Sequence, residues 1–262
     1  MKHLLPRLIV PLLALVLSPA ARALEVRFLA WDEKVAARPL AVLGAEGKGE
    51  TAVKDLHPLK RSPAVDANLS EATLLLRVLD RKDGAGKPVD FSVKVAGNMT
   101  RPLVLLLPDP KAVSGLRGYA LEDDVANFPW GTFRLLNGTG TELGVALGSL
   151  RKLLPASWTP LDMLPGGDKS LPVEIVMSAE PKKPIYSAIW KADPNVRRLV
   201  FVVPGTEPRL GPLAIKVIPE DRKGLELEAE ADRAGGAGAG VAAKAGTGAS
   251  ARSAEHRTEE EP

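Results

Sequence analysis

The sequence predicts an all-β protein with two tandem Ig-like β-sandwich domains, and three observations favour this class. Short apolar runs are separated by turn-forming residues, and most of the 23 prolines lie at the ends of these runs. Almost no segment keeps the 3.6-residue apolar period of an amphipathic helix. The order of apolar motifs in the first half of the chain recurs in the second half. Many short strands bounded by turn residues are typical of β-sandwiches.

Residues 1–23 are predicted to be a cleaved signal peptide. Two bases precede the apolar run Leu8–Leu17, which is too short to span a bilayer as a mature helix. Ala21–Ala23 then fits the small-x-small cleavage rule, so we expect the mature chain to begin at Leu24. An uncleaved anchor is the alternative. The signal predicts an exported protein, either periplasmic or extracellular.

Composition and charge exclude several classes of protein. The chain has no cysteine, so an exported form must be stabilised by its core without disulfides. No later segment approaches about 18 uninterrupted apolar residues, so no membrane span is expected after signal cleavage. The net charge of +3 comes from three bases in residues 1–23, while residues 24–223 carry +4 and residues 224–262 carry −4. Such a mildly basic body lacks the dense basic face of nucleic-acid-binding proteins.

The first half of the chain is predicted to contain five strands. Each is a short apolar or alternating segment that ends near glycine, proline or a charged turn. A polar loop over residues 44–71 interrupts the series. The strands are Leu24–Trp31, Pro39–Gly44, Thr73–Leu79, Pro88–Val95 and Leu103–Leu107.

The second half repeats these motifs in the same order. Residues 88–91 and 101–108 match residues 184–187 and 197–204 with a common offset of 96, and residues 40–44 match 144–148. Residues 26–29 match 133–136 with an offset of 107. The difference of 11 fits the longer 44–71 loop of the first copy. A repeat of about 100 residues is the size of a domain rather than of a solenoid unit.

These boundaries predict a five-part layout. The segment from Pro108 to Gly118 contains Pro, Asp, Ser and Gly, and residues 111–118 within it are expected to be the linker. Residues 225–231 could form a marginal helical or strand-like stub, and the Gly/Ala-rich remainder is expected to be disordered because it cannot bury enough apolar surface. The predicted parts are a signal peptide (1–23), domain 1 (24–110), a linker (111–118), domain 2 (119–223) and a tail (224–262).

Few residues in the chain are suited to catalysis or metal binding. His57 is the only histidine outside the signal and the tail, so a zinc site or a Cys-His nucleophile pair is not expected. The Gly-x-Ser-x-Gly elbow and the glycine-rich phosphate loops are also missing. We therefore expect no catalytic residue, no metal and no cofactor.

The most concentrated polar group is Glu122, Asp123 and Asp124, which leads into the segment Phe128–Asn137. Paired carboxylates could act as acid and base on a glycan, or bind calcium. Neighbouring residues on a strand point to opposite faces, however, and the spacing of a calcium loop is absent. A solvated turn is the interpretation that we favour, with these acids as low-ranking candidates for ligand binding.

The four tryptophans could form a platform on which sugar rings stack. Packing in the core is the competing interpretation, and Tyr186 and Trp190 are expected to share one face of a strand. Trp130 is the candidate for ligand binding, because Pro129 and Gly131 place it in a loop, where aromatic residues are more often exposed.

Residues Phe128–Gly131 and Arg134–Asn137, followed by Arg197–Pro204, resemble uncharacterised exported bacterial proteins with Ig-like β-sandwich domains. In these proteins a strand containing Phe or Val, Arg, two hydrophobic residues and Asn opens a sandwich. The resemblance covers mainly residues 119–219. It implies an export route and a sandwich fold, and it assigns no catalytic residue.

The sequence therefore favours a non-enzymatic binding or structural protein of the bacterial envelope. Another envelope protein or a surface glycan would be its partner. The alternative is a carboxylate-dependent glycan hydrolase that uses the acids at positions 122–124. An exposed pair of aromatic residues including Trp130 would favour glycan binding, whereas acids that line a cleft would favour the hydrolase.

Overall fold

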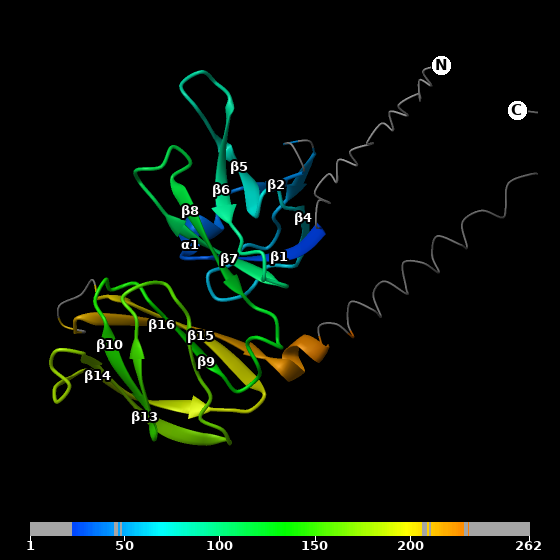
Figure 1. The fold of residues 1–262 in the computed structure, drawn as a ribbon. Helices are drawn as coiled ribbons and strands as arrows, with labels where there is room; N and C mark the ends of the chain where they lie inside the picture. Colours follow the sequence, from blue (N-terminus) through cyan, green and yellow to red (C-terminus); the bar gives the residue numbers. More distant parts are fainter. Residues whose placement is uncertain are drawn as a thin grey trace, which may run out of the picture. The chain divides into compact units, whose positions relative to one another are not determined.

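The computed structural model of the chain describes residues 23–44, 47, 49–205, 209, 211–227 and 230. The predicted signal peptide and most of the predicted tail lie outside these residues. The chain divides into two units, with the boundary between Asp124 and Val125. Both units are all-β, as the sequence predicts (Figure 1). In the described part of the chain, α-helical residues are those of α1 (Glu33–Ala36), residues 222–227 and residue 230.

Unit 1, which ends at Asp124, is a sandwich of two four-stranded sheets. One sheet has the order β4-β1-β7-β8 and the other has the order β3-β2-β5-β6. Its strands are β1 (Ala23–Ala30), β2 (Leu40–Leu43), β3 (Glu50–Ala52), β4 (Val65–Asn68), β5 (Thr73–Lys82), β6 (Pro88–Lys94), β7 (Pro102–Pro108) and β8 (Leu116–Glu122).

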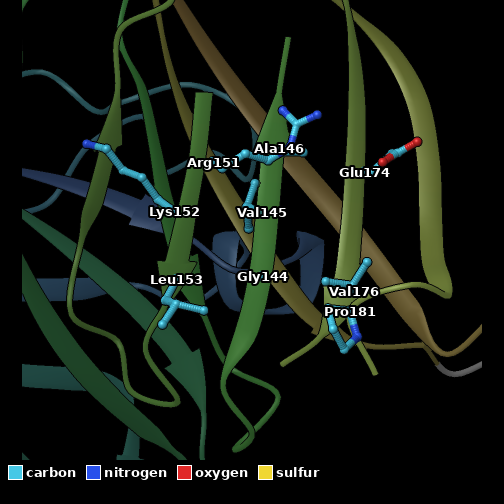
Figure 2. A pocket seen from close by; sticks show the side chains of 9 residues that line it. All are labelled: Gly144, Val145, Ala146, Arg151, Lys152, Leu153, Glu174, Val176 and Pro181. Carbon is cyan, nitrogen blue, oxygen red and sulfur yellow. The ribbon is translucent and has the colours of Figure 1, made fainter. Parts of the chain in front are cut away.

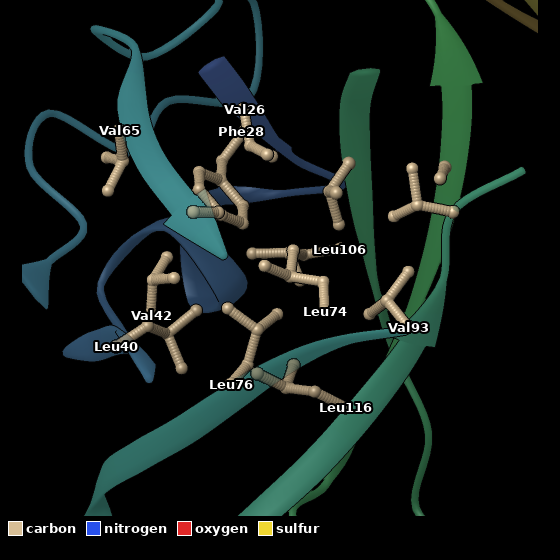
Figure 3. Packing of buried hydrophobic residues seen from close by; sticks show 14 of the residues in the cluster. Val26, Phe28, Leu40, Val42, Val65, Leu74, Leu76, Val93, Leu106 and Leu116 are labelled. Atoms are coloured by element: carbon tan, nitrogen blue, oxygen red, sulfur yellow. The ribbon is translucent and has the colours of Figure 1, made fainter. Parts of the chain in front are cut away.

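The core of unit 1 lies between its two sheets (Figure 3). Phe28 of β1 and Leu106 of β7 come from one sheet, and Leu74 and Leu76 of β5 come from the other. All four side chains are 0% exposed. Alternate burial along β5 matches the period of two that its sequence shows, because successive strand residues point to opposite faces.

Unit 2, which begins at Val125, is a second sandwich of two four-stranded sheets. The sheet orders are β12-β9-β15-β16 and β11-β10-β13-β14. Its strands are β9 (Phe133–Asn137), β10 (Leu143–Leu147), β11 (Leu150–Leu154), β12 (Leu161–Met163), β13 (Lys169–Met177), β14 (Pro184–Ala192), β15 (Val196–Pro204) and β16 (Leu213–Asp221).

The two units share one strand order, in which each strand of unit 2 has a number eight higher than its counterpart in unit 1. The first strand of each unit pairs in parallel with the seventh. Arg27 lies opposite Leu103 in unit 1, and Arg134 lies opposite Leu199 in unit 2. Arg27 and Arg134 differ by 107 positions, and Leu103 and Leu199 differ by 96, as in the sequence comparison. The motif matches for β1 with β9 and for β7 with β15 are therefore in structural register.

The other two motif matches are one residue out of register. The offset of 96 equates Phe91, which packs against the core, with the exposed Ser187. The match for β2 equates the core residue Val42 with Ala146, although the core residues of β10 are its neighbours Val145 and Leu147. A shift of one residue exchanges the faces of a strand, and alignment on prolines and glycines does not detect this.

The structure places the boundary between the units later than the sequence predicts. The expected linker 111–118 belongs to the hairpin between β7 and β8, and β8 pairs with β7 over its whole length. Asp109 donates its backbone N–H to Gly115 O at 2.9 Å, and Gly115 has a φ of 71°. The residues of a tight turn and of a linker are the same types, which explains why composition alone gave the wrong boundary.

One flank of unit 1 is closed where β6 and β8 lie against each other. A methyl group added to Gly118 of β8 would lie 2.2 Å from Val93 Cγ2 of β6. Val93 is 1% exposed, and Ala120 of β8 is 9% exposed. Glycine is therefore required at position 118 for the two sheet edges to approach each other.

We expect Gly118→Ala to destabilise unit 1 by about 1–3 kcal/mol, because the new methyl group overpacks the flank. Urea unfolding followed by circular dichroism would measure this loss. Gly84→Ala is the matched control, since nothing lies within 4 Å of a methyl group added there. Equal effects of the two substitutions would contradict a role for Gly118 in closing the flank.

Candidate functional site

The predicted acidic group lies at the end of unit 1, and its central member is buried in an ion pair. Arg61 donates from Nε to Asp123 Oδ2 at 2.7 Å and from Nη2 to Asp123 Oδ1 at 2.9 Å. The side chains of Arg61 and Asp123 are only 4% and 5% exposed. The backbone N–H of Asp123 donates to Arg101 O at 3.0 Å. Asp123 thus connects the loop around Arg61 to the end of β8.

Glu122 and Asp124 hold the same end of unit 1 in place. Glu122 Oε2 accepts the backbone N–H of Thr100 at 2.7 Å, and Oε1 accepts those of Arg101 and Asp124 at 3.2 and 2.9 Å. Asp124 Oδ2 lies 3.8 Å from Arg101 Nε, and its side chain is 25% exposed. Backbone amides and guanidinium groups therefore occupy the carboxylates that a hydrolase would use as acid and base.

Phe128 and Trp130 lie against two buried arginines at the start of unit 2. The guanidinium carbons of Arg134 and Arg197 lie 4.3 and 4.9 Å from the centroid of the Phe128 ring. Arg197 also lies 5.1 Å from the Trp130 ring. Each arginine is paired with an acid, Arg134 with Asp162 and Arg197 with a glutamate of β16. Trp130 is half-buried in this cluster.

All four tryptophans are half-buried in the structure. Trp190 stacks on Phe133 with ring centroids 5.7 Å apart and an angle of 16° between the ring planes. Its Nε1 donates to Tyr186 Oη at 3.3 Å, which confirms that Tyr186 and Trp190 share one face of β14. Trp158 lies 6.1 Å from Phe201. For Trp158 and Trp190 these contacts favour packing over a sugar-binding platform.

Among the described residues, unit 2 has a groove of about 350 Å³ on the outer face of the sheet β11-β10-β13-β14 (Figure 2). Gly144 and Ala146 of β10 form its floor. Leu153 and Val176 stand on either side of Gly144, where they are its cross-strand neighbours. The groove is lined by Gly144, Val145, Ala146, Arg151, Lys152, Leu153, Glu174, Val176 and Pro181.

Small floor residues keep this groove open. A methyl group added to Gly144 would lie 2.8 Å from Val176 Cγ2, so glycine leaves space that another residue would fill. Leu153 is 57% exposed, which is unusual for a large aliphatic side chain on a sheet face. At one end of the groove Arg151 and Glu174 flank Ala146 as cross-strand neighbours. The result is an aliphatic depression with opposite charges at one end.

The corresponding face of unit 1 carries a network of charges instead. Arg77 of β5 projects from the outer face and pairs with Asp90 at 2.7 Å and with Glu50. The hydrogen bonds that Arg77 donates to Asp90, and then the one to Glu50, raise the pKa of Arg77 above its ordinary value. The charges of Arg77, Asp90 and Glu50 therefore satisfy one another on this face, whereas the matching sheet of unit 2 carries the groove lined by Leu153 and Val176.

Neither the groove nor the contrast with unit 1 was predicted from the sequence. The available signal was the alternation of Gly144 and Ala146 on the outward side of an otherwise apolar strand. Among the described residues, no group of three or more His, Asp or Glu side chains is arranged to hold a metal ion. In that part of the chain no helix has the length and hydropathy to cross a bilayer.

Comparisons with known proteins assign the chain to no family. No protein-family model matches the chain, and no curated protein matches it. Among solved structures, the chain is similar to the crystal structure of a "putative cell adhesion protein" from Bacteroides uniformis ATCC 8492. The two share 9% sequence identity with a TM-score of 0.21, over 76% of this chain and 98% of the other.

Proposed function

We propose that the protein is a non-enzymatic binding protein exported to the bacterial envelope, and that unit 2 carries its partner-binding surface. The predicted signal peptide supports export. The engagement of Glu122 and Asp123 in hydrogen bonds and an ion pair supports a role without carboxylate catalysis. The observation that carries the proposal is the aliphatic groove beside Leu153.

The lining of the groove favours a protein partner over a glycan. Its walls are aliphatic and none of its nine lining residues is aromatic, whereas sugar rings are bound by stacking on aromatic faces. An aliphatic side chain of a partner would fill the depression between Leu153 and Val176. Arg151 and Glu174 would hold partner charges of opposite sign at the other end, which adds orientation and selectivity more than affinity.

The experiment is a cross-linked capture from envelope extract with the mature chain, residues 24–262, and matched variants. We expect Leu153→Asp to reduce capture of the partner by about tenfold or more, because a charge is placed in the apolar centre of the interface. Leu59→Asp in unit 1 is the control, since Leu59 is 56% exposed, as Leu153 is 57% exposed. That control should capture the partner normally.

Two outcomes would refute this proposal. One is capture that Leu153→Asp and Leu59→Asp reduce equally. The other is binding to surface glycans that persists in Leu153→Asp, which would assign binding to a different surface and class of ligand. Circular dichroism of both variants checks that each remains folded.

A further inference from the structure

A second feature distinguishes unit 2 from unit 1, and it lies on the flank between β14 and β16. In unit 1 the matching strands β6 and β8 close the flank through Gly118 and Ala120. These residues lie opposite Leu106 and Val104 of β7. The offset of 96 relates Leu106 and Val104 of β7 to Val202 and Val200 of β15, which lie opposite Ile215 and Val217. Ile215 and Val217 therefore take the places of Gly118 and Ala120 in unit 2.

The larger residues leave the flank of unit 2 more open than that of unit 1. Ile215 and Val217 of β16 are only partly buried, and so are Tyr186 and Trp190 of β14. Over the described residues, β14 and β16 do not lie against each other as β6 and β8 do. Unit 2 therefore has a row of core side chains along this flank that its own strands cover incompletely.

Among the described residues, no strand pairs with the outward edge of β14 beside this flank. Gly148 donates its N–H to Pro172 O at 2.8 Å, so the backbone groups of Pro172 face β10. Ile189 lies opposite Pro172, and its N–H and C=O consequently face away from β13. By alternation the same holds for Ser187 and Lys191. β14 ends the strand order of its sheet in the described part of the chain.

The charges beside this edge indicate which charge a strand that pairs with β14 would carry. Residues 182–192 contain three lysines and no acid. Lysine on an edge strand opposes pairing with another copy of the same basic edge, and it favours a segment that carries acids. A strand that pairs with β14 must also present apolar residues at every second position to cover the row formed by Tyr186 and Trp190.

We propose that the free edge of β14 binds an extended acidic segment of a partner protein by β-strand addition, with alternate apolar side chains of that segment covering the open flank of unit 2. Backbone hydrogen bonds to Ser187, Ile189 and Lys191 supply affinity in this mode, and the alternating side chains supply specificity. The inference rests on the proposed function only in that the partner is a protein. It uses a different surface from the groove beside Leu153.

The test uses a labelled nine-residue peptide that alternates valine and glutamate, titrated with the mature chain by fluorescence anisotropy. Ile189→Pro removes the outward N–H without breaking a bond to β13, since proline is tolerated where an edge N–H faces solvent. We expect this variant to bind the peptide about tenfold more weakly, consistent with the loss of one hydrogen bond and its neighbours. Ile189→Thr keeps the N–H and should bind within about threefold of the wild type.

A second arm does not depend on the folding of a variant. Methylating alternate backbone nitrogens of the peptide should abolish binding to the unmodified chain, and a scrambled peptide of the same composition should bind weakly. Lys191→Glu should also weaken binding. The difference in peptide affinity between this variant and the wild type should be smaller at high salt, because exposed charges are screened. Binding that is unaffected by both Ile189→Pro and peptide methylation would overturn the proposal.

Two further measurements distinguish binding of an acidic segment at β14 from dimerisation of the chain and from binding at the groove beside Leu153. If the mature chain dimerises and Ile189→Pro converts it to a monomer while the peptide fails to compete, the edge pairs with a second copy and the acidic-partner proposal is overturned. Leu153→Asp should leave peptide affinity unchanged. If Leu153→Asp loses partner capture but still binds the peptide, the groove and the edge of β14 are both binding surfaces. If the peptide binds and Leu153→Asp captures the partner as well as the wild type does, the groove is not the partner site, and the proposal for β14 still stands.

Discussion

Asp123→Ala is expected to destabilise unit 1 by about 3–5 kcal/mol, because it leaves the guanidinium of Arg61 buried without its partner. Arg61 is 7% exposed and makes two hydrogen bonds to Asp123, so the substitution removes both while the guanidinium remains buried. The free energy of unfolding, obtained from urea titrations of the mature chain, measures this loss. Arg61→Met with Asp123→Leu should recover much of it, since replacing both charges removes the desolvation cost.

The neighbouring residue supplies the control for Asp123. Asp124 has a side chain that is 25% exposed and lies 3.8 Å from Arg101, which is itself 58% exposed. An exposed ion pair of this kind contributes about 0–1 kcal/mol, so Asp124→Ala should have a small effect. If the two alanine variants were equally stable, the Arg61–Asp123 pair would have no special part in holding the end of unit 1.

Phe128→Ala is expected to destabilise unit 2 by a similar amount, about 3–5 kcal/mol. The Phe128 ring is 0% exposed and lies between the guanidinium groups of Arg134 and Arg197. Its removal opens a cavity and also ends two cation–π contacts, each of which contributes about 0.5–2 kcal/mol. Thermal and urea unfolding of unit 2, followed through its tryptophan fluorescence, measures the loss.

Val125→Ala is the control for Phe128. It lies in the same connecting segment, but its side chain is 37% exposed, so we expect a change of less than about 1 kcal/mol. Phe128→Leu should lie between the two, because it keeps apolar volume but lacks the aromatic face that the arginines contact. An effect of Phe128→Leu equal to that of Phe128→Ala would indicate that the cation–π contacts, rather than the cavity, dominate.

The segment around positions 122–130, which the sequence suggests as a ligand site, has a structural role in both units. Acids and aromatic residues crowd around positions 122–130, and this crowding suggests a ligand site. In the structure Asp123 and Phe128 are among the most buried polar and aromatic side chains of their units. The crowding arises because the last strand of unit 1 and the first strand of unit 2 each need anchoring close to the boundary at Asp124.

Local sequence was sufficient to predict the longer apolar strands, whereas β3 and β4 lie in the polar segment 44–71 that was expected to be a loop. Leu103–Leu107 and Leu199–Val203 are apolar without interruption, and they form the central strands β7 and β15. Strands buried on both faces carry this signal in a few consecutive residues. The same local reasoning failed at residues 111–118, because a hairpin turn and a linker have the same composition.

The candidate surfaces could not be predicted in the same way. Leu153, Gly144 and Val176 are far apart in sequence and become neighbours only through the pairing of β10 with β11 and β13. The difference between Gly118 and Ile215 has meaning only once β8 and β16 are known to occupy matching positions. Contacts between strands depend on register, and a shift of one residue would invert every face.

The sequence by itself determined the all-β class, the positions of apolar strands such as β1, β5 and β7, and the offsets that relate β1 to β9 and β7 to β15. These features depend on apolar periodicity, which a short window of residues records. Only the tertiary structure decided the boundary at Asp124, the burial of Asp123 against Arg61 and the difference between the closed flank of unit 1 and the open flank of unit 2. Each of these depends on which distant residues meet across a sheet or a core.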